Sequence, residues 1–224
     1  MFKFKSTILI LSLSTTFALA NGYFIGFSGG LNHSSVNDDN NDLISDNNLL
    51  LSPKFGYQIN NTHRYSISYE HGGKSSDSKS YDIELDRGVI ANESVKYEFT
   101  SNKFLLGYDY TPLIWRNLRA DIGVFAGYSF GKLNVEDGPT QDTSQAAPGY
   151  LDGFNYGAKL GDLYEIGNRW DIEFGAKIMR TTYKSKDLDI SFDIDGGKTH
   201  EVENNTFRLK QLDMGAYLGV SYRF

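Results

Sequence analysis

The end of the chain alternates between apolar and other side chains without interruption. Every second residue from Leu212 to Phe224 is apolar or aromatic, and the residues between them are polar, small or phenolic. Side chains of a β-strand point alternately to its two faces, and each residue advances the strand by about 3.3 Å. The segment is therefore long enough to cross a hydrocarbon layer with one apolar face. We predict a membrane-spanning strand here.

Seven earlier segments repeat this period of two. In the first of them, Tyr23, Ile25 and Phe27 share one face, and Phe24 is the exception that falls on the other. The pattern predicts strands over residues 21–32, 49–59, 64–71, 104–110, 118–130, 153–161, 170–178 and 211–224.

Polar connections of two lengths separate these strands in strict alternation. The long ones cover residues 33–48, 72–94, 134–148 and 185–205, and the short ones lie at 60–62, 111–117 and 167–168. Bacterial outer-membrane barrels have an even number of strands, short periplasmic turns and longer external loops. The pattern therefore predicts an all-β fold, an eight-stranded antiparallel transmembrane β-barrel with four long extracellular loops.

Two of the long connections contain strand patterns of their own. Residues 81–85 alternate, and we expect them to pair with residues 95–99 as a hairpin beyond the membrane. The apolar residues of 95–99 and of 104–110 have opposite parity, which predicts a β-bulge at Ser101–Lys103, because one inserted residue turns every later side chain to the other face. Residues 188–194 lead into Asp193–Gly197, which we interpret as a hairpin turn.

The composition favours strands and excludes several kinds of chemistry. The chain has 23 Gly, 15 Tyr, 15 Phe and only 4 Pro. No segment after the amino terminus approaches the roughly 18 consecutive apolar residues of a membrane helix. The absence of Cys excludes disulfides, thiol chemistry, Cys-based metal sites and a Cys-linked lipid anchor.

The amino-terminal segment has the three parts of a secretory signal peptide. Lys3 and Lys5 form a basic region, residues 6–17 are apolar or small, and Ala18 and Ala20 provide a cleavage motif. A retained membrane helix would need about 20 apolar residues. We therefore predict a cleaved signal peptide over residues 1–20 and one outer-membrane β-barrel domain over residues 21–224, exported through the periplasm to the bacterial outer membrane.

Charge placement distinguishes a membrane barrel from a soluble β-sandwich, the alternative all-β fold. An eight-stranded barrel is only wide enough to be filled by side chains, so charges inside it must pair. Equal numbers of cations and anions occupy the expected inward positions: Lys54, Arg64, Arg119, Lys159, Lys177, Arg223, Glu70, Asp109, Asp121, Asp171, Glu173 and Asp213. In a sandwich, the same charges would form a solvated face.

The expected outward face carries apolar residues and two groups of aromatic residues. A Lys or Arg on this face would cost about 2 to 4 kcal/mol near the middle of the bilayer. The aromatic residues fall near the short-turn ends at Tyr57, Tyr65, Tyr110, Trp115, Trp170 and Tyr222, and near the long-loop ends at Tyr69, Tyr128, Phe130 and Phe154. Aromatic girdles at both interfaces are typical of membrane proteins.

The glycine-rich and aromatic first strand, the four long loops and the carboxy-terminal Ser-Tyr-Arg-Phe resemble one known family. It is that of small outer-membrane β-barrel proteins of the OmpA-transmembrane, OmpX and opacity-protein type, and the resemblance covers residues 21–224. It implies a monomer that contacts outer-membrane lipid and lipopolysaccharide and reaches the assembly machinery through the strand ending at Phe224. Unlike OmpA itself, the chain shows no peptidoglycan-binding domain after the barrel pattern.

The histidines are the natural starting point for a search for catalysis. His71 lies near Ser68 and Glu70, which invites comparison with barrels that deacylate or palmitoylate lipid A, but His71 has the opposite parity and points to lipid. The adjacency of His33 and Ser34 carries little information. We therefore predict no enzyme and no catalytic residues.

A calcium loop is the other chemical motif to be weighed. Asp38, Asn40 and Asp42 match its first positions, but Leu43 and Leu49 stand where the turn glycine and the bidentate Glu belong. No phosphate-binding loop and no basic stripe for nucleic acid is present. We predict no metal site, no cofactor and no nucleic-acid partner.

The expected function follows from a filled lumen and exposed loops. We expect a role in envelope integrity, in adhesin-like attachment of the loops to an extracellular ligand, or in both. A small pore or a conduit for a hydrophobic ligand is the alternative, and a lipid A-modifying enzyme comes after it. Hairpins beyond the membrane favour attachment, because exposed strand edges can accept a partner strand.

Overall fold

The computed structural model describes residues 21–38, 42–85, 89–137, 149–185, 191–194, 198–201 and 208–224. The strands are β1 (Gly22–Asn37), β2 (Asp42–Ile59), β3 (His63–Leu85), β4 (Val89–Tyr110), β5 (Leu113–Trp115), β6 (Leu118–Asp137), β7 (Gly149–Ile166), β8 (Trp170–Ser185), β9 (Ser191–Ile194), β10 (Lys198–Glu201) and β11 (Arg208–Arg223). The predicted signal peptide lies outside the described residues. Among the described residues, no helix is long and apolar enough to cross a membrane.

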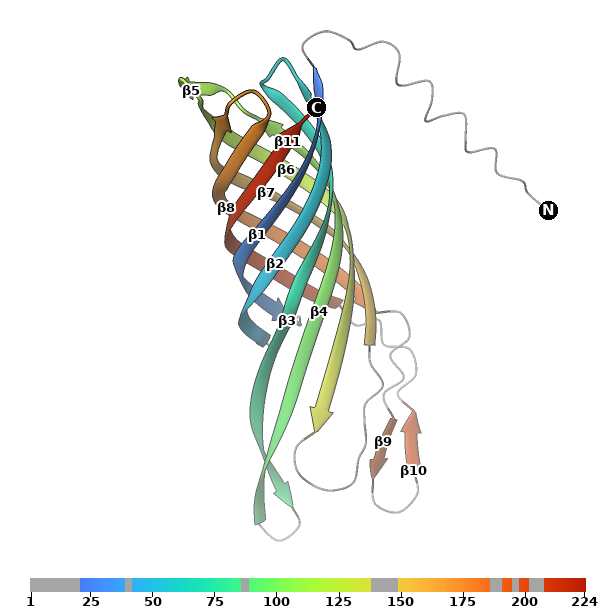
Figure 1. Cartoon of the computed structure of the whole chain (residues 1–224). Coiled ribbons are helices and arrows are strands. Elements are labelled where there is room, and N and C mark those ends of the chain that lie inside the picture. Colours follow the sequence, from blue (N-terminus) through green and yellow to red (C-terminus); the bar gives the residue numbers. More distant parts are fainter. Residues whose placement is uncertain are drawn as a thin grey trace, which may run out of the picture.

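Eight long antiparallel strands close into a barrel (Figure 1). The hydrogen-bonded order is β4-β3-β2-β1-β11-β8-β7-β6, and the pairing of β4 with β6 joins the two ends of this sheet. The first and last strands are neighbours, with Phe27 opposite Val220. The predicted all-β fold and its strand number are confirmed.

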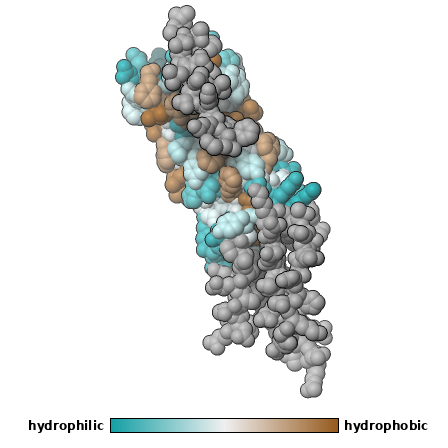
Figure 2. Space-filling model, turned by 90° about the vertical axis from the view of Figure 1, so that its right-hand side faces the viewer, coloured by the Kyte–Doolittle hydropathy of each residue, from teal (hydrophilic) through white to brown (hydrophobic). Residues whose placement is uncertain are grey.

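The two faces of the wall have the predicted sidedness. Leu31 is 71% exposed on the outside, whereas its neighbour Asn32 is 3% exposed in the lumen. Figure 2 shows apolar residues, in brown, distributed over the barrel wall. Charged residues on the outward faces lie towards the two ends of the wall, such as the half-buried Asp162 near the short turns and the exposed Arg180 near the long loops. Phe24 points inward, as its parity requires, and is buried.

Aromatic rings contact one another near both ends of the apolar wall. At the short-turn end, the ring centroids of Trp170 and Tyr222 lie 4.9 Å apart. At the long-loop end, those of Tyr69 and Phe104 lie 5.1 Å apart. Amphipathic rings are favoured where hydrocarbon meets headgroups. Both predicted groups of aromatic residues are therefore present as surface belts.

The short connections have the predicted turn chemistry. Asn60 and Asn61 both adopt positive φ, a conformation that asparagine tolerates better than most residues, and Gly167 has φ of 62°. The Thr62 amide donates to the Ile59 carbonyl at 3.0 Å. The third short connection contains β5, a short strand paired with the start of β6.

The long connections are shorter than predicted, because strands replace much of them. β1 continues to Asn37 and β2 begins at Asp42, so most of the segment 33–48 is paired strand rather than loop. Beyond the hydrocarbon layer the outer face meets water, and polar residues there leave the backbone ladder intact. The end of the apolar pattern marks the end of the lipid contact and not the end of the strand.

The predicted hairpin of β3 and β4 is present, but the predicted bulge is wrong. Tyr81 pairs with Glu93 rather than with residues 95–99. β4 keeps an unbroken register against β6 through Ser101–Lys103, and the irregularity lies in β3 between Gly72 and Ser75. Phe99 is inward and buried. The apolar parity changes because the interior becomes apolar at this level, not because the strand slips.

A separate hairpin joins β9 and β10, with Ile194 opposite Lys198. It confirms the hairpin predicted from residues 188–194. The predicted turn residues between its strands lie outside the described part of the chain.

Candidate functional site

The lumen near the short-turn end is built around Arg64. This side chain is 1% exposed, and its guanidinium lies 4.0 Å from the centre of the Phe24 ring. It donates to Glu173 Oε1 and to Ser221 Oγ, each at 3.0 Å. Lys54 also pairs with Glu173. A charge in this confined space is stabilised only if its partners replace the lost water, and these contacts do so.

A second cluster occupies the middle of the lumen. Lys159 Nζ lies 3.0 Å from Asp109 Oδ2 and 2.9 Å from Asp121 Oδ2. The Tyr217 hydroxyl donates to Asp121 at 3.0 Å. One cation is therefore shared between two carboxylates. The Tyr217 phenol satisfies part of the remaining hydrogen-bond-accepting capacity of one of them, Asp121.

The third cluster lies towards the long loops and includes a cation that the sequence did not assign. Lys103 pairs with Asp213, which also accepts from Asn32 at 3.0 Å. Glu70 pairs with Lys177, and its other oxygen lies 4.0 Å from Lys103 Nζ. Lys103 was not predicted to face the lumen, because the bulge predicted at Ser101–Lys103 left the direction of its side chain undefined.

A fourth group closes the short-turn rim. Arg119 donates to Glu165 Oε1 at 2.8 Å, and Arg223 lies 3.0 Å from Asp171 Oδ1. Glu165 was not predicted, since the strand pattern of its segment was ended at residue 161. All twelve charges that the sequence placed in the lumen take part in ion pairs there, so the prediction of a paired, filled interior is confirmed.

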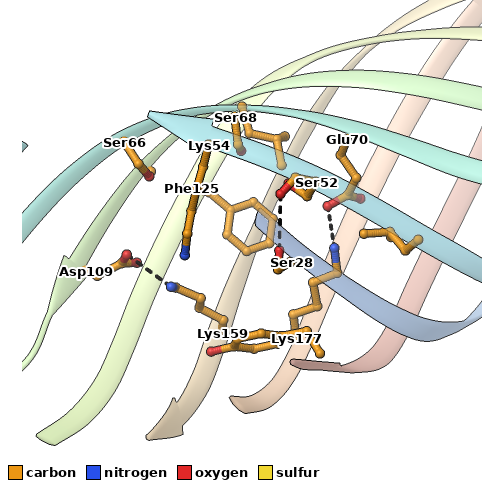
Figure 3. A pocket seen from close by; sticks show the side chains of 14 residues that line it. Ser28, Ser52, Lys54, Ser66, Ser68, Glu70, Asp109, Phe125, Lys159 and Lys177 are labelled. Atoms are coloured by element: carbon orange, nitrogen blue, oxygen red, sulfur yellow. Dashed lines mark hydrogen bonds and ion pairs between the residues drawn. The ribbon is translucent and has the colours of Figure 1, made fainter. Parts of the chain in front are cut away.

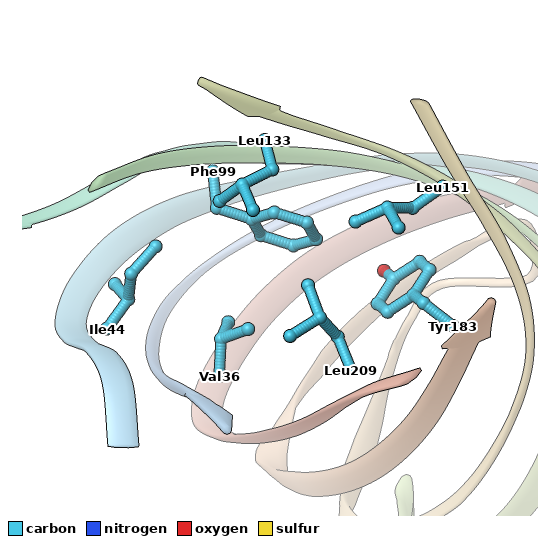
Figure 4. Close-up of a cluster of buried hydrophobic side chains, with 7 residues drawn as sticks. All are labelled: Val36, Ile44, Phe99, Leu133, Leu151, Tyr183 and Leu209. Carbon is cyan, nitrogen blue, oxygen red and sulfur yellow. The ribbon is translucent and has the colours of Figure 1, made fainter. Parts of the chain in front are cut away.

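An apolar layer lies inside the barrel beyond these charges (Figure 4). No member of the layer is more than 6% exposed: Val36, Ile44, Phe99, Leu133, Leu151, Tyr183 and Leu209. The Phe99 and Tyr183 rings meet edge to face with centroids 5.5 Å apart. The Tyr183 hydroxyl donates to Gln211 at 2.8 Å. Tyr183 thus joins the apolar layer to the polar network below it.

A cavity of about 80 Å³ remains within the polar part of the lumen (Figure 3). Four serines line it, Ser28, Ser52, Ser66 and Ser68, together with the charged ends of Lys54, Lys159, Lys177, Glu70 and Asp109. Buried water commonly satisfies polar atoms in such spaces. The cavity has room for a few water molecules, and Leu50, Leu105, Phe125 and Tyr217 line it beside the polar groups.

The candidate catalytic residues are not brought together. His71 is exposed and its Nδ1 lies 2.7 Å from Asn102 Oδ1, whereas Glu70 faces the lumen. Ser68 lines the internal cavity on that opposite face. His33 contacts Asn47 at 3.0 Å, while the neighbouring Ser34 is buried inside the barrel. Neither histidine forms a catalytic group with the serine predicted beside it.

The described residues also contain no metal centre. No group of three or more His, Asp or Glu side chains in the described ranges has the arrangement of a metal site. Of the residues in the calcium-like motif, Asn40 lies outside those ranges. The carboxylates of the lumen clusters are paired with ammonium or guanidinium groups.

Comparison with known proteins found similarity to solved structures of low sequence identity. Neither protein-family models nor curated proteins gave a match. Neisserial surface protein A (NspA) is 12% identical, with 90% of this chain and 97% of that chain covered and a TM-score of 0.48. The attachment invasion locus protein Ail of Yersinia pestis is 16% identical, with coverages of 90% and 98% and a TM-score of 0.48. The outer membrane protease OmpT from Escherichia coli is 8% identical, with coverages of 91% and 96% and a TM-score of 0.47.

These similarities assign no activity to this chain. The closed barrel with an apolar outer wall and a polar, paired lumen is the architecture of an integral outer-membrane β-barrel.

Proposed function

We propose that this protein is a sealed outer-membrane barrel that presents rigid strand extensions for attachment outside the cell. The observation that carries the proposal is the order of the layers inside the barrel. Charge pairs fill the membrane part, the apolar layer closes it, and the strands continue past that layer. On this proposal the long strands form a structure on the cell surface, and the filled lumen does not form a pore.

The β3–β4 hairpin is the largest of these extensions (Figure 1). β3 pairs with β2 as far as Gly72, and the Ser76 amide then donates to the Asp46 side chain at 2.9 Å. Beyond that point β3 remains paired with β4 up to Leu85, while its other edge has left β2. An edge of this kind can bind an extended peptide as an additional strand.

The sealed lumen is tested by single-channel recording in planar bilayers. The folded protein should give no reproducible open level at physiological salt, because about a dozen paired charges and an apolar layer obstruct ion flow. Regular, large conductance steps from purified monomer would contradict the proposal and support a pore instead.

Attachment is tested by shortening the hairpin. Asp77 and Tyr97 are cross-strand partners, so an Asn-Gly turn can replace residues 78–96 between them. Expressing cells should then lose adhesion to protein-coated glass. A control variant that shortens the connection of residues 138–148 keeps the hairpin and should adhere normally. Equal adhesion by both variants and the wild type would refute a role for the hairpin.

A further inference from the structure

The free edge of β3 beyond the barrel has carboxylates bound to two of its backbone amides. β3 pairs with β2 only as far as Gly72, whereas its pairing with β4 continues along the projecting hairpin (Figure 1). The Ser76 amide points away from β4 and donates to Asp46 Oδ2 at 2.9 Å. Backbone groups of a strand alternate in direction, so the Ser78 amide points the same way, and it donates to Asp77 Oδ1 at 2.8 Å. Two carboxylates therefore hold amides that an added strand needs.

These two hydrogen bonds determine what the free edge can bind. An unprotected edge accepts almost any extended chain, and proteins often protect such edges with charged side chains. A partner strand forms its ladder with the amides of Ser76 and Ser78, so it displaces both carboxylates. A partner that offers the carboxylates no new contact therefore binds more weakly than it would to an unprotected edge.

The two carboxylates lie on the same face of the sheet. Asp77 has the parity of the buried Ser75 on β3, and Asp46 has that of the buried Ile44 on β2. The amides that they hold are two residues apart, which is roughly 6.6 Å along a strand. Side chains at alternate positions of an added strand have the same spacing on one face, and opposite charges placed across a ladder stabilise it. Two alternate cations in the partner thus match the two carboxylates.

This face of the free edge retains negative charge. Within the described ranges, Asp46 and Asp77 bond to backbone amides and not to a cation. Lys74 pairs with Glu98 instead. Among the described residues of β2 and β3 beyond Gly72 and its partner Leu50, one cation, Lys79, shares the parity of Asp77. The two carboxylates outnumber it.

We propose that the free edge of β3 is selective for an extended basic peptide segment, whose cations at alternate positions pair with Asp46 and Asp77 as the segment displaces them. This inference rests on the proposed function, in which the hairpin binds its partner as an added strand. The exposed side chains of Ser76 and Ser78 are small, so they leave room for the long stems of Lys or Arg. The backbone ladder supplies affinity for any extended peptide, and the two carboxylates supply the selectivity.

The test measures peptide binding by the folded mature chain in neutral detergent at low ionic strength. The probes are three short peptides in which Thr alternates with Lys, Gln or Glu. A fourth peptide repeats the Lys sequence with methylated backbone nitrogens, which cannot form the ladder. The double variant Asp46→Asn, Asp77→Asn keeps an acceptor oxygen for each amide and removes the charge. The control, Asp142→Asn with Asp162→Asn, removes the same charge elsewhere.

The wild type should bind the Lys peptide about fivefold or more tightly than the Gln peptide, because two exposed ion pairs are gained. The double Asn variant should bind these two peptides equally, and the control should keep the preference. The methylated Lys peptide should bind too weakly to measure, which separates strand addition from simple attraction between charges. A Lys preference that is absent from the wild type, or unchanged in the double Asn variant, would overturn the proposal.

Two further variants separate this inference from the proposed function. Asp46→Ala with Asp77→Ala leaves both amides without their carboxylates and should bind the Gln peptide about twofold or more tightly than the wild type does. The variant in which Asn-Gly replaces residues 78–96 lacks the free edge and should bind no peptide. A shift in gel mobility on boiling shows whether each variant is folded, and Asp77→Asn alone should lose part of the Lys preference if a double variant fails to fold.

The pattern of failure identifies which statement is wrong. Peptide binding that is independent of charge but is lost on shortening the hairpin would refute the selectivity and leave attachment by strand addition intact. Binding of the Lys peptide that persists in the shortened variant would place the peptide elsewhere and refute the inference. If the wild type bound none of the peptides, both the inference and the proposed strand addition would be refuted.

Discussion

At the scale of single residues, the lumen depends on partners that cannot be removed one at a time. Glu173 receives contacts from Lys54, Arg64 and Ser221, and its side chain is 1% exposed. Burial of a charge is tolerated only with such compensation, and removing one member leaves the others without it. The cost of a substitution here is therefore set by the charges that remain.

Glu173→Gln should destabilise the barrel by about 3 to 5 kcal/mol, because Lys54 and Arg64 would keep their charges without the shared carboxylate. Urea unfolding in lipid vesicles, followed by tryptophan fluorescence, measures this change. Glu165→Gln at the more accessible rim is the matched control and should cost less. Equal losses of unfolding free energy for the two variants would show that the central network contributes no more to stability than the rim does.

The hairpin beyond the membrane contains a charge cluster that responds to pH. Hydrogen bonds from Lys74 and Lys96, at 2.5 Å and 2.7 Å, hold the pKa of Glu98 below its ordinary value of 4.5. Because the pKa is lower in the folded protein, the cluster stabilises the hairpin above pH 4.5. That contribution disappears as the pH falls through the lowered pKa.

Glu98→Gln should therefore increase amide exchange in residues 75–100 at pH 7, and the effect should be smaller at pH 3, where more of the wild type is protonated. Hydrogen exchange with mass spectrometry provides the measurement, after correction for the intrinsic rates at each pH. Lys79→Gln, a substitution on the paired strand β3 outside this cluster, serves as the control. An effect of Glu98→Gln that is equal at both pH values would exclude an ionic origin.

At the scale of strands, the sequence predicted the parts that touch lipid and failed where the solvent changes. Outward residues such as Ile67 and Leu106 were placed correctly, because lipid requires an apolar face at every second position. Phe99 obeys the same alternation but points inward, since the outer face there meets water. The alternation alone does not show which face of a strand meets water. For this reason the sequence predicted a bulge where the structure has an apolar interior.

β5 is a strand whose apolar residues have no described partner layer. Leu113, Ile114 and Trp115 are all exposed, Trp115 by 64%, and β5 projects sideways from the short-turn end (Figure 1). The Arg116 guanidinium lies 4.9 Å from the centre of the Trp115 ring. Consecutive strand residues point to opposite faces, so both faces of this projection favour an apolar or interfacial environment.

We predict that β5 lies in the headgroup region of the inner leaflet. The chain has two tryptophans, so Trp170→Phe leaves Trp115 as the single reporter. Its emission should be quenched more strongly by phospholipids brominated near the headgroup than by those brominated near the chain end. Trp115→Phe, which reports Trp170 on the barrel wall, provides the reference depth. Quenching of Trp115 by aqueous iodide alone would place β5 in the periplasm.

At the scale of the whole molecule, one continuous sheet encloses two different interiors. Within the membrane the wall is apolar outside and the lumen holds charge pairs; beyond it the interior is apolar, as in the packing of Phe99 against Tyr183. Within the membrane, the polar side chains point into the lumen, away from the hydrocarbon. Beyond the membrane, they point outwards, towards water. The sequence predicted twelve of the ion-pairing residues of the lumen and missed Lys103 and Glu165. It gave no sign of the apolar layer, whose members come from seven strands spread along the chain.

The last strand of the chain closes this sheet. Deleting its final residue, Phe224, allows the effect on stability and the effect on assembly to be measured separately. The Phe224 amide donates to the Tyr23 carbonyl at 3.0 Å, and its ring, 68% exposed, meets Tyr222 edge to face. Deleting Phe224 removes one terminal hydrogen bond and little buried area, so it should change the stability of refolded protein by only about 1 kcal/mol.

If the assembly machinery recognises the last strand through Phe224, deletion should nevertheless sharply reduce the yield of folded protein in the outer membrane of cells. The heat-modifiable fraction on gels measures that yield, and unfolding of the protein refolded in vitro measures the stability. Tyr222→Ala removes a neighbouring aromatic ring and leaves the carboxy-terminal phenylalanine in place, so it should assemble better than the deletion. A normal yield after deletion would contradict recognition at Phe224, whereas a large loss of stability in vitro would assign the defect to folding itself.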